Sequence, residues 1–187
     1  MSGLQGSGPL SEGDRLAEAG ARPVLIGIDG RSGSGKTTLA AALVARLAPC
    51  ADVRLLALED MYPGWDGLSA VTHDDGPYVG ALRRLAHGSP AEIPTWDWHG
   101  SQPGPVRTLG PAAVVVCEGV GALSRGARGL LTLGVWVEAD DRARRERALA
   151  RDGETYAPHW DRWAEQEQRY LAAHAPATAA DLRLRLP

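Results

Sequence analysis

Residues 27–40, GIDGRSGSGKTTLA, constrain the fold of this chain more than any other stretch. From Gly30 to Thr37 they match the pattern G-x-x-x-x-G-K-[ST] without a gap. The apolar run VLIGIDG at 24–30 predicts a buried strand, and leucines and valines at helical spacing predict a helix over 35–47. A strand, a glycine-rich loop and a helix in this order form a cradle for phosphate groups. The sequence therefore predicts a nucleoside triphosphate site directly after the first strand.

The residue types in this loop suit a polyphosphate. Glycines let main-chain amides approach an anion closely, and the N-terminus of the following helix adds partial positive charge. Lys36 is the only lysine in the chain, whereas the other 19 basic residues are arginines. A compact ammonium fits this loop better than a planar guanidinium, which explains why lysine is kept here. Thr37 is predicted to give an oxygen ligand to Mg²⁺. The residues predicted to bind the nucleotide are Gly30, Ser32, Gly33, Ser34, Gly35, Lys36, Thr37 and Thr38.

Apolar segments alternate with helical patterns along the whole chain. The predicted strands are 24–30, 52–60, 112–119, 134–139 and 181–187. The predicted helices are 35–47, 77–87, 140–152 and 158–174. This alternation predicts an α/β fold, a parallel five-stranded sheet with helices on both faces. The last strand is expected at an edge, because its leucines alternate with arginines.

The organisation of the rest follows from composition. We expect residues 1–20 to be a flexible segment and 21–187 to form a single domain, with a small arginine-rich lid at about 140–157. Residues 88–106 are rich in proline and glycine and are predicted to be a long loop, which at this length favours a functional role.

Acidic residues end the second and third predicted strands. The carboxyl ends of parallel strands meet at one edge of the sheet, so these acids are expected near the phosphate loop. Of Glu59 and Asp60, only one can face the site if the segment is extended, and Asp60 is predicted to take the proton of an attacking hydroxyl. Glu118 is predicted to hold Mg²⁺ or its water. The competing interpretation is that these are solvated acids at a turn or a strand end.

Five segments, in this order, resemble the uridine kinase and phosphoribulokinase group of P-loop kinases. They are IGIDGRSGSGKTTLA, LEDMYPGWDG, GSPAEIPTWDWHGS, VVVCEGV and DDRARRERALARD. The resemblance covers about residues 22–155 and implies the three-layer P-loop NTPase fold, with ATP and Mg²⁺ as cofactors. It implies that Asp60 is the general base and that Arg145 and Arg151 are lid residues near the phosphates. The loop DMYPGW departs from the uridine kinase pattern, which leaves other small-metabolite kinases, such as pantothenate kinase-like enzymes, open.

The acceptor side of the site is predicted mainly from this resemblance. It implies that Tyr62, Asp97 and His99 contact the acceptor, with Trp96 and Trp98 flanking the aspartate. Trp65, Trp96 and Trp98 fall in predicted loops, where stacking on a planar acceptor and packing on the core are both open.

The predicted lid poses a geometric difficulty. Arg145 and Arg151 are six residues apart, so a straight helix does not put them on one face unless it breaks or moves. The competing interpretation of these arginines is a solvated face laced with ion pairs.

Charge and hydropathy exclude several classes of function. A net charge of −3 without a basic stripe argues against nucleic acid as a partner. No apolar run approaches the roughly 18 residues of a membrane span, and two cysteines form no metal or disulfide pattern, so a cytoplasmic protein is expected. Tryptophan-rich helices late in the chain make a homodimer an open expectation.

The leading hypothesis is an ATP-dependent phosphotransferase, a kinase that acts on a hydroxyl of a small metabolite, for example a nucleoside such as uridine. The alternative is a regulatory or switch-type P-loop NTPase without a small-molecule acceptor. Such a switch needs a residue that positions water, and no glutamine follows the third predicted strand.

Overall fold

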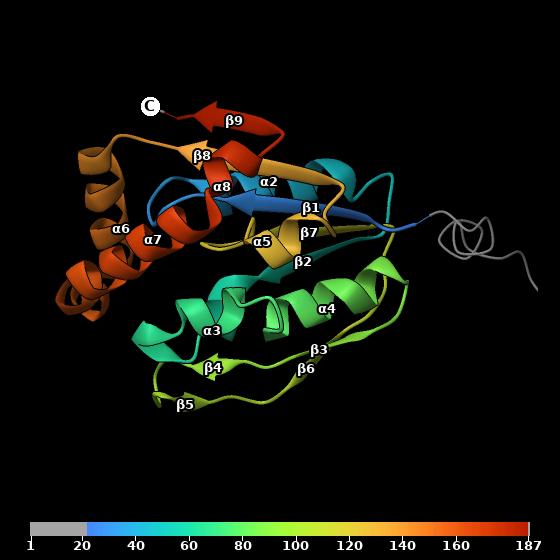
Figure 1. Ribbon diagram of the computed structural model, residues 1–187, viewed down its shortest axis with the longest axis horizontal. Helices are drawn as coiled ribbons and strands as arrows, with labels where there is room; N and C mark the ends of the chain where they lie inside the picture. The colour runs from blue at the N-terminus through green and yellow to red at the C-terminus, as the bar shows by residue number, and fades with distance from the viewer. Residues whose placement is uncertain (1–21, 187) are drawn as a thin grey trace, which may run out of the picture.

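The computed structural model describes residues 22–186 (Figure 1), so the predicted flexible segment 1–20 lies outside the described residues. Its centre is a five-stranded sheet in the order β2-β7-β1-β8-β9. The strands are β1 (Val24–Asp29), β2 (Val53–Ala57), β7 (Val114–Glu118), β8 (Leu133–Glu138) and β9 (Leu182–Arg185). Every neighbouring pair is parallel. The predicted parallel sheet, with the last strand at an edge, is confirmed.

Helices cover both faces of this sheet because successive side chains of a strand point to opposite sides. Along β1, Leu25 packs into one hydrophobic cluster, whereas Ile26 and Ile28 pack into another. The first cluster includes residues of α3 (Leu68–Thr72), α4 (Pro77–Ala86) and α7 (Trp160–His174). The second includes residues of α2 (Lys36–Leu47). The predicted three-layer arrangement is therefore present.

The predicted loop, residues 88–106, contains short strands that pair with each other or with residues just beyond it. They form two short antiparallel ladders, β3 (Ala91–Ile93) with β6 (Arg107–Leu109) and β4 (Trp96–Asp97) with β5 (Gln102–Pro103). Figure 1 shows these strands beyond α3 and α4, away from the main sheet. Strands of two or three residues are too short to show an alternating pattern between prolines and glycines, which is why the sequence did not predict them.

The second strand ends earlier than predicted. β2 stops at Ala57, and η1 (Leu58–Met61) follows as a 3₁₀ turn. Leu58 and Met61 are both buried, at 0% and 3% exposure, because residues three apart lie on the same side of a 3₁₀ turn. Glu59 and Asp60 lie between them, in a turn and not in an extended strand.

The last third of the chain returns to the sheet through four helical segments. These are α6 (Asp141–Tyr156), η3 (Ala157–His159), α7 and α8 (Pro176–Ala179). Two further short elements, η2 (Gly64–Asp66) and α5 (Arg125–Arg128), follow β2 and β7. Trp160 and Trp163 are buried, so core packing accounts for the tryptophans that raised the expectation of a dimer. No helix within residues 22–186 is long and apolar enough to cross a membrane.

Candidate functional site

A cavity of about 410 Å³ opens where the segments after β1, β2 and β7 meet. Its lining joins the phosphate loop, strand-end acids, aromatic side chains and the end of α6. The lining residues are Ser32, Lys36, Thr37, Glu59, Tyr62, Trp65, Trp98, His99, Glu118, Gly119, Val120, Arg151, Asp152, Thr155, Tyr156 and Trp163. Residues from five separate stretches of sequence thus face one space.

The phosphate loop has the backbone that its glycines predict. Gly33 and Gly35 have φ angles of 76° and 96°, in the left-handed region that favours glycine. A Cβ at Gly33 would also lie 1.9 Å from the main-chain oxygen of Arg144, so no other residue fits there. No described side chain caps α2, whose first residue is Lys36, so its first amides are available to an anion.

Four of the predicted nucleotide-binding residues line one of two cavities. Ser32, Lys36 and Thr37 line the main cavity. Lys36 is 8% exposed and its ammonium donates to the main-chain oxygen of Arg31 at 3.4 Å. Ser34 faces a second cavity of about 250 Å³ beside the loop. Thr38 lies in the first turn of α2, outside both linings. The residues of the second cavity are Arg31, Ser34, Trp136, Val137, Glu138, Ala139, Asp141, Arg144 and Arg185.

Thr37 and Glu118 form an oxygen-rich pair in the lining of the main cavity. The Thr37 hydroxyl lies 3.3 Å from each carboxylate oxygen of Glu118. The pKa of Glu118 is raised, mainly by burial. The charge of Lys36 opposes this increase, and the charge of Glu59 adds to it. Hydroxyl and carboxylate oxygens are ligands that Mg²⁺ prefers, and the ion usually combines one or two protein ligands with phosphate oxygens. The described residues contain no cluster of three or more His, Cys, Asp or Glu that would hold a metal unaided. The pair therefore fits Mg²⁺ that arrives with a nucleotide.

The two acids after β2 have different surroundings. Glu59 lines the cavity, whereas Asp60 does not. The Asp60 carboxylate forms an ion pair with Arg107 of β6 and is 44% exposed. The prediction assumed alternating side chains in an extended strand, whereas both acids lie in a 3₁₀ turn. The assignment of the general base stays a prediction. The indole of Trp98 donates to the main-chain oxygen of Glu59 at 3.2 Å, which ties this turn to the β4–β5 arm.

Aromatic side chains line the same cavity as the phosphate loop. Trp65 lies at their centre, with its ring centroid 4.9 Å from that of Trp98 and stacked on Tyr156 at 5.3 Å. Tyr62 packs against Trp163 at 5.0 Å and donates its hydroxyl to a main-chain oxygen. Tyr62 therefore offers the cavity the edge or face of its ring, since its hydroxyl is already used. Tyr62, Trp65 and the lining residue His99 were all predicted to contact the acceptor.

Two other predicted acceptor contacts lie outside the cavity. Asp97 accepts hydrogen bonds from the amides of Gly100 and His99, at 3.1 and 3.0 Å, and these bonds lower its pKa. It therefore stabilises the turn between β4 and β5. Trp96 lies beside Gly64, where a Cβ would be 3.5 Å from its ring. The predicted roles of Trp96 and Asp97 in acceptor binding stay predictions, since neither residue lines the cavity.

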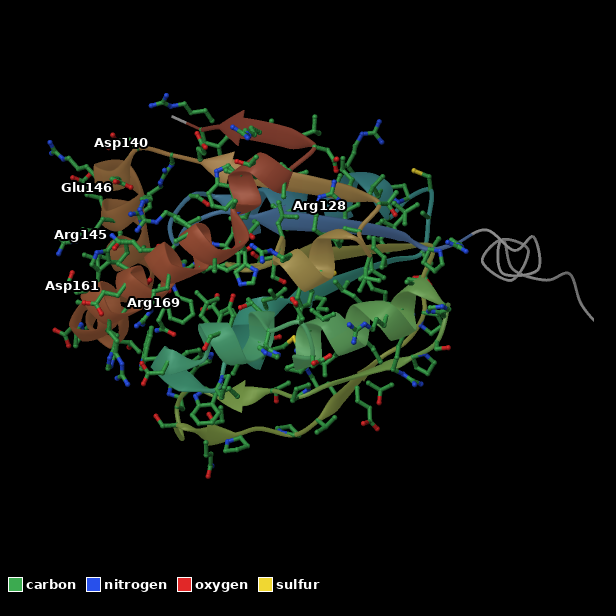
Figure 2. The ribbon with its side chains drawn as sticks, viewed as in Figure 1. Arg128, Asp140, Arg145, Glu146, Asp161 and Arg169 are labelled. Atoms are coloured by element: carbon green, nitrogen blue, oxygen red, sulfur yellow. The ribbon has the colours of Figure 1, made fainter. Side chains whose placement is uncertain are left out.

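The two predicted lid arginines are separated. Arg151 lines the cavity and pairs with Asp152 at 2.7 Å, which raises its pKa. Arg145 is exposed on the outer side of α6 (Figure 2), with its guanidinium 5.8 Å from the ring centroid of Trp160. The helix does break, at Gly153, but the break follows both arginines and does not bring them together.

Glu167 of α7 ties the phosphate loop to α6. It is 1% exposed and accepts hydrogen bonds from the amide of Ser32 at 2.7 Å and the guanidinium of Arg31 at 2.9 Å. Arg144 of α6 lies 3.8 Å from the same carboxylate. This cluster holds the start of α6 against the loop without entering the main cavity.

Comparisons with known proteins agree with this geometry, although no family model matches the chain. The uridine kinase of Lactobacillus helveticus is 31% identical over 144 residues, which cover 70% of this chain and 68% of that protein. The uridine kinase of Leuconostoc citreum is 32% identical over 149 residues, 71% of this chain and 70% of that protein. The chain belongs to the uridine kinase family. It is therefore a P-loop kinase of small molecules.

The fold of this kinase has a solved counterpart. A possible uridine kinase from Bacillus stearothermophilus superposes with a TM-score of 0.61 at 21% identity. The match covers 91% of this chain and 96% of the other. This likeness confirms the predicted P-loop kinase fold.

Several cavity residues of the kinase were not predicted as site residues. Asp152, Thr155, Tyr156 and Trp163 reach the cavity from α6 and α7. Trp163 has the helical spacing of a core residue and is also buried, so periodicity identifies its burial but not the cavity that it borders. The helix break that turns the last residues of α6 inward occurs at a glycine, which is the one local signal the sequence carried.

Proposed function

We propose that the chain transfers the γ-phosphoryl group of ATP, with Mg²⁺, to a hydroxyl of a neutral acceptor that carries a planar ring, such as a nucleoside. One observation carries the proposal: Lys36, the Thr37–Glu118 pair and Glu59 line the same cavity as five aromatic side chains. Aromatic walls favour planar ligands over polyols. The relatives named uridine kinase make uridine the first acceptor to test.

Each group at the phosphate end has a defined task. The amides of the loop and the ammonium of Lys36 hold the β- and γ-phosphates. Thr37 and Glu118 hold Mg²⁺, which neutralises charge on the phosphate oxygens when bound. The nucleoside of ATP extends into the second cavity, which adjoins the same loop at Ser34.

At the acceptor end, Glu59 is the general base. Its carboxylate accepts the proton of the acceptor hydroxyl while that oxygen attacks the γ-phosphorus and ADP leaves. Residues 140–157 act as the lid, and Arg151 balances the charge that spreads over the transferred group. Arg151 already pairs with Asp152, and Lys36 faces the phosphates, so the lining offers no spare arginine or lysine for an anionic acceptor.

An acceptor panel tests this proposal. Purified protein with ATP and Mg²⁺ is assayed for ADP release with uridine, cytidine, adenosine, fructose, glycerate and pantothenate, and products are checked by mass spectrometry. Nucleosides are expected to be phosphorylated in preference to the others. Phosphorylation of only the polyols or acids contradicts the ring requirement, and ATP hydrolysis that no acceptor stimulates favours the switch-type alternative.

A cytoplasmic location and a homodimer stay predictions.

The choice of base is tested by a pair of isosteric variants. Glu59→Gln is expected to lower kcat by about 10²-fold or more, with little change in ATP affinity, because general-base catalysis contributes roughly that much. Asp60→Asn is the matched control and keeps the wild-type kcat, since its carboxylate pairs with Arg107 outside the cavity. Steady-state kinetics and calorimetry with ATP measure both effects. The reverse result, with Asp60→Asn inactive and Glu59→Gln active, makes Asp60 the base.

A further inference from the structure

A fully buried carboxylate beside the phosphate loop takes no direct part in the proposed chemistry. Asp29 ends β1 and is 0% exposed. One of its oxygens accepts the amides of Gly30 at 2.7 Å and Gly121 at 3.1 Å. The other accepts the amide of Leu123 at 2.8 Å and the hydroxyl of Tyr170 at 2.6 Å. A single side chain thus joins the start of the phosphate loop, the segment after β7 and α7.

The segment after β7, residues 119–123, is also held from its other side. The main-chain oxygen of Val120 accepts the hydroxyl of Tyr62 at 2.7 Å. The main-chain oxygen of Ala122 accepts the hydroxyl of Tyr78 at 3.0 Å. Two of its amides thus bind Asp29 and two of its carbonyls bind tyrosines. Glu118 directly precedes this segment.

Only a carboxylate satisfies all the donors that point at Asp29. The four donors are three amides and one hydroxyl, two on each oxygen. An asparagine has one acceptor oxygen, and its amino group would face donors in place of the second. Burial raises the pKa of Asp29 above its usual value, and the four hydrogen bonds oppose this by favouring the charged form. Burying a carboxylate without a cation beside it costs free energy, even when it is hydrogen-bonded. A buried carboxylate at this position therefore indicates a functional role.

The position of Asp29 in the sheet indicates that role. In the β1–β7 ladder Ile28 pairs with Glu118, and Asp29 is the next residue along β1. On one side Asp29 leads into the phosphate loop that carries Thr37, and on the other it fixes the segment that follows Glu118. The Thr37 hydroxyl and the Glu118 carboxylate, 3.3 Å apart, lie next to the two segments that Asp29 joins.

We propose that Asp29 is a positioning residue that sets the spacing of Thr37 and Glu118 and so determines how strongly Mg²⁺ strengthens ATP binding. The proposal rests on the proposed function in one respect, that Mg²⁺ binds with ATP at this pair. Replacing a residue that orients a metal ligand without touching the metal typically lowers metal affinity by about 10- to 100-fold. Asp29 acts through the backbone, so we expect the lower end of this range.

The test measures ATP binding by calorimetry with Mg²⁺ and with EDTA. The ratio of the two dissociation constants is the effect of the metal. Asp29→Asn is expected to reduce this ratio about tenfold. Tyr170→Phe removes one of the four donors but keeps the carboxylate, and it is expected to reduce the ratio less, in the same direction. Thermal unfolding of each variant is recorded alongside.

Asp181→Asn is the matched control. Asp181 also accepts a strand amide, that of Gly134 at 2.7 Å, and forms an ion pair with Arg128. Gly134 lies near the start of β8, whereas Asp29 pairs with Trp136 farther along that strand. This substitution is expected to lower the unfolding temperature and leave the metal effect on ATP binding unchanged. A merely structural role for Asp29 gives Asp29→Asn this same pattern.

The outcomes separate this inference from the proposed function. A wild-type metal effect in folded Asp29→Asn overturns the inference and leaves the kinase assignment intact. If Asp29→Asn does not fold, Tyr170→Phe decides, and an unchanged ratio in that variant overturns the inference. Wild-type protein whose ATP affinity is the same with Mg²⁺ and with EDTA contradicts the proposed metal site, and the inference fails with it.

Discussion

Lys36 lies inside the loop that it serves, with 8% of its surface exposed and Ser32 and Thr37 beside it in the cavity lining. Its ammonium needs little space, whereas a guanidinium is planar and wider. We expect Lys36→Arg to lose about 10²-fold or more in kcat/KM, near the loss in Lys36→Ala, because loss of one preorganised charge contact typically costs this much. Steady-state kinetics check this. Arg46→Lys, an exposed substitution in the last turn of α2, is the control and keeps wild-type rates. Near-normal activity in Lys36→Arg contradicts the argument.

The sequence predicts a residue's place in the site where a local pattern determines it, and does not where tertiary packing determines it. Lys36 belongs to a local motif that follows β1, and Glu118 ends β7, so a motif and a strand end place them in one cavity. The local arrangement of Glu59 and Asp60 could not be predicted, because it depends on a 3₁₀ turn that begins one residue before them. Trp163 reaches the cavity from a distant helix, and only tertiary packing brings it there.

At the scale of elements, length and periodicity decided what the sequence could predict. The five sheet strands and α2, α4, α6 and α7 have at least four residues each and show regular patterns. Elements without such a pattern were not predicted: the short helices α3, α5 and α8, and strands β3 to β6 with two or three residues each. Their positions depend on packing against the larger elements, as with β3 against α4.

The break in α6 is an element-scale feature with a testable energetic basis. Gly153 has φ 55° and ψ −136°, a backbone that residues with a Cβ rarely adopt. We expect Gly153→Ala to destabilise the protein by about 1–3 kcal/mol, and to raise the KM for the acceptor because Thr155 and Tyr156 shift with the helix. Urea unfolding and steady-state kinetics measure the two effects.

Gly80 in the middle of α4 is the control for that substitution. Among the described atoms, none lies within 4 Å of a Cβ added at Gly80 or at Gly153, so neither alanine clashes. Gly80→Ala is expected to stabilise the protein by about 0.5–1 kcal/mol, since glycine is unfavourable inside a regular helix. Equal effects of the two substitutions show that the backbone at Gly153 is not strained for alanine.

At the scale of the whole molecule, one face of α7 contacts each part of the site. Trp163 lines the cavity, Glu167 binds the phosphate loop, and Tyr170 donates to Asp29. His174 stacks on Tyr170 at 4.9 Å and accepts the first amide of α5. These four α7 residues are spaced four, three and four apart, the period of one helix face. The stability of α7 and the geometry of the site are therefore coupled.

His174 gives this coupling a dependence on pH. Burial, reinforced by the charge of Arg125 and opposed by Asp74, lowers the pKa of His174 below 6.5. Below pH 6.5 the unfolded chain therefore binds a proton that the folded chain resists, so the free energy of unfolding falls as the pH drops toward the folded pKa. In His174→Asn an amide oxygen replaces the acceptor nitrogen without titrating. Urea unfolding between pH 7.5 and about pH 5 is expected to show a smaller loss of stability in the variant than in the wild type. The other four histidines are common to both proteins, so equal losses in the two place the pH dependence elsewhere.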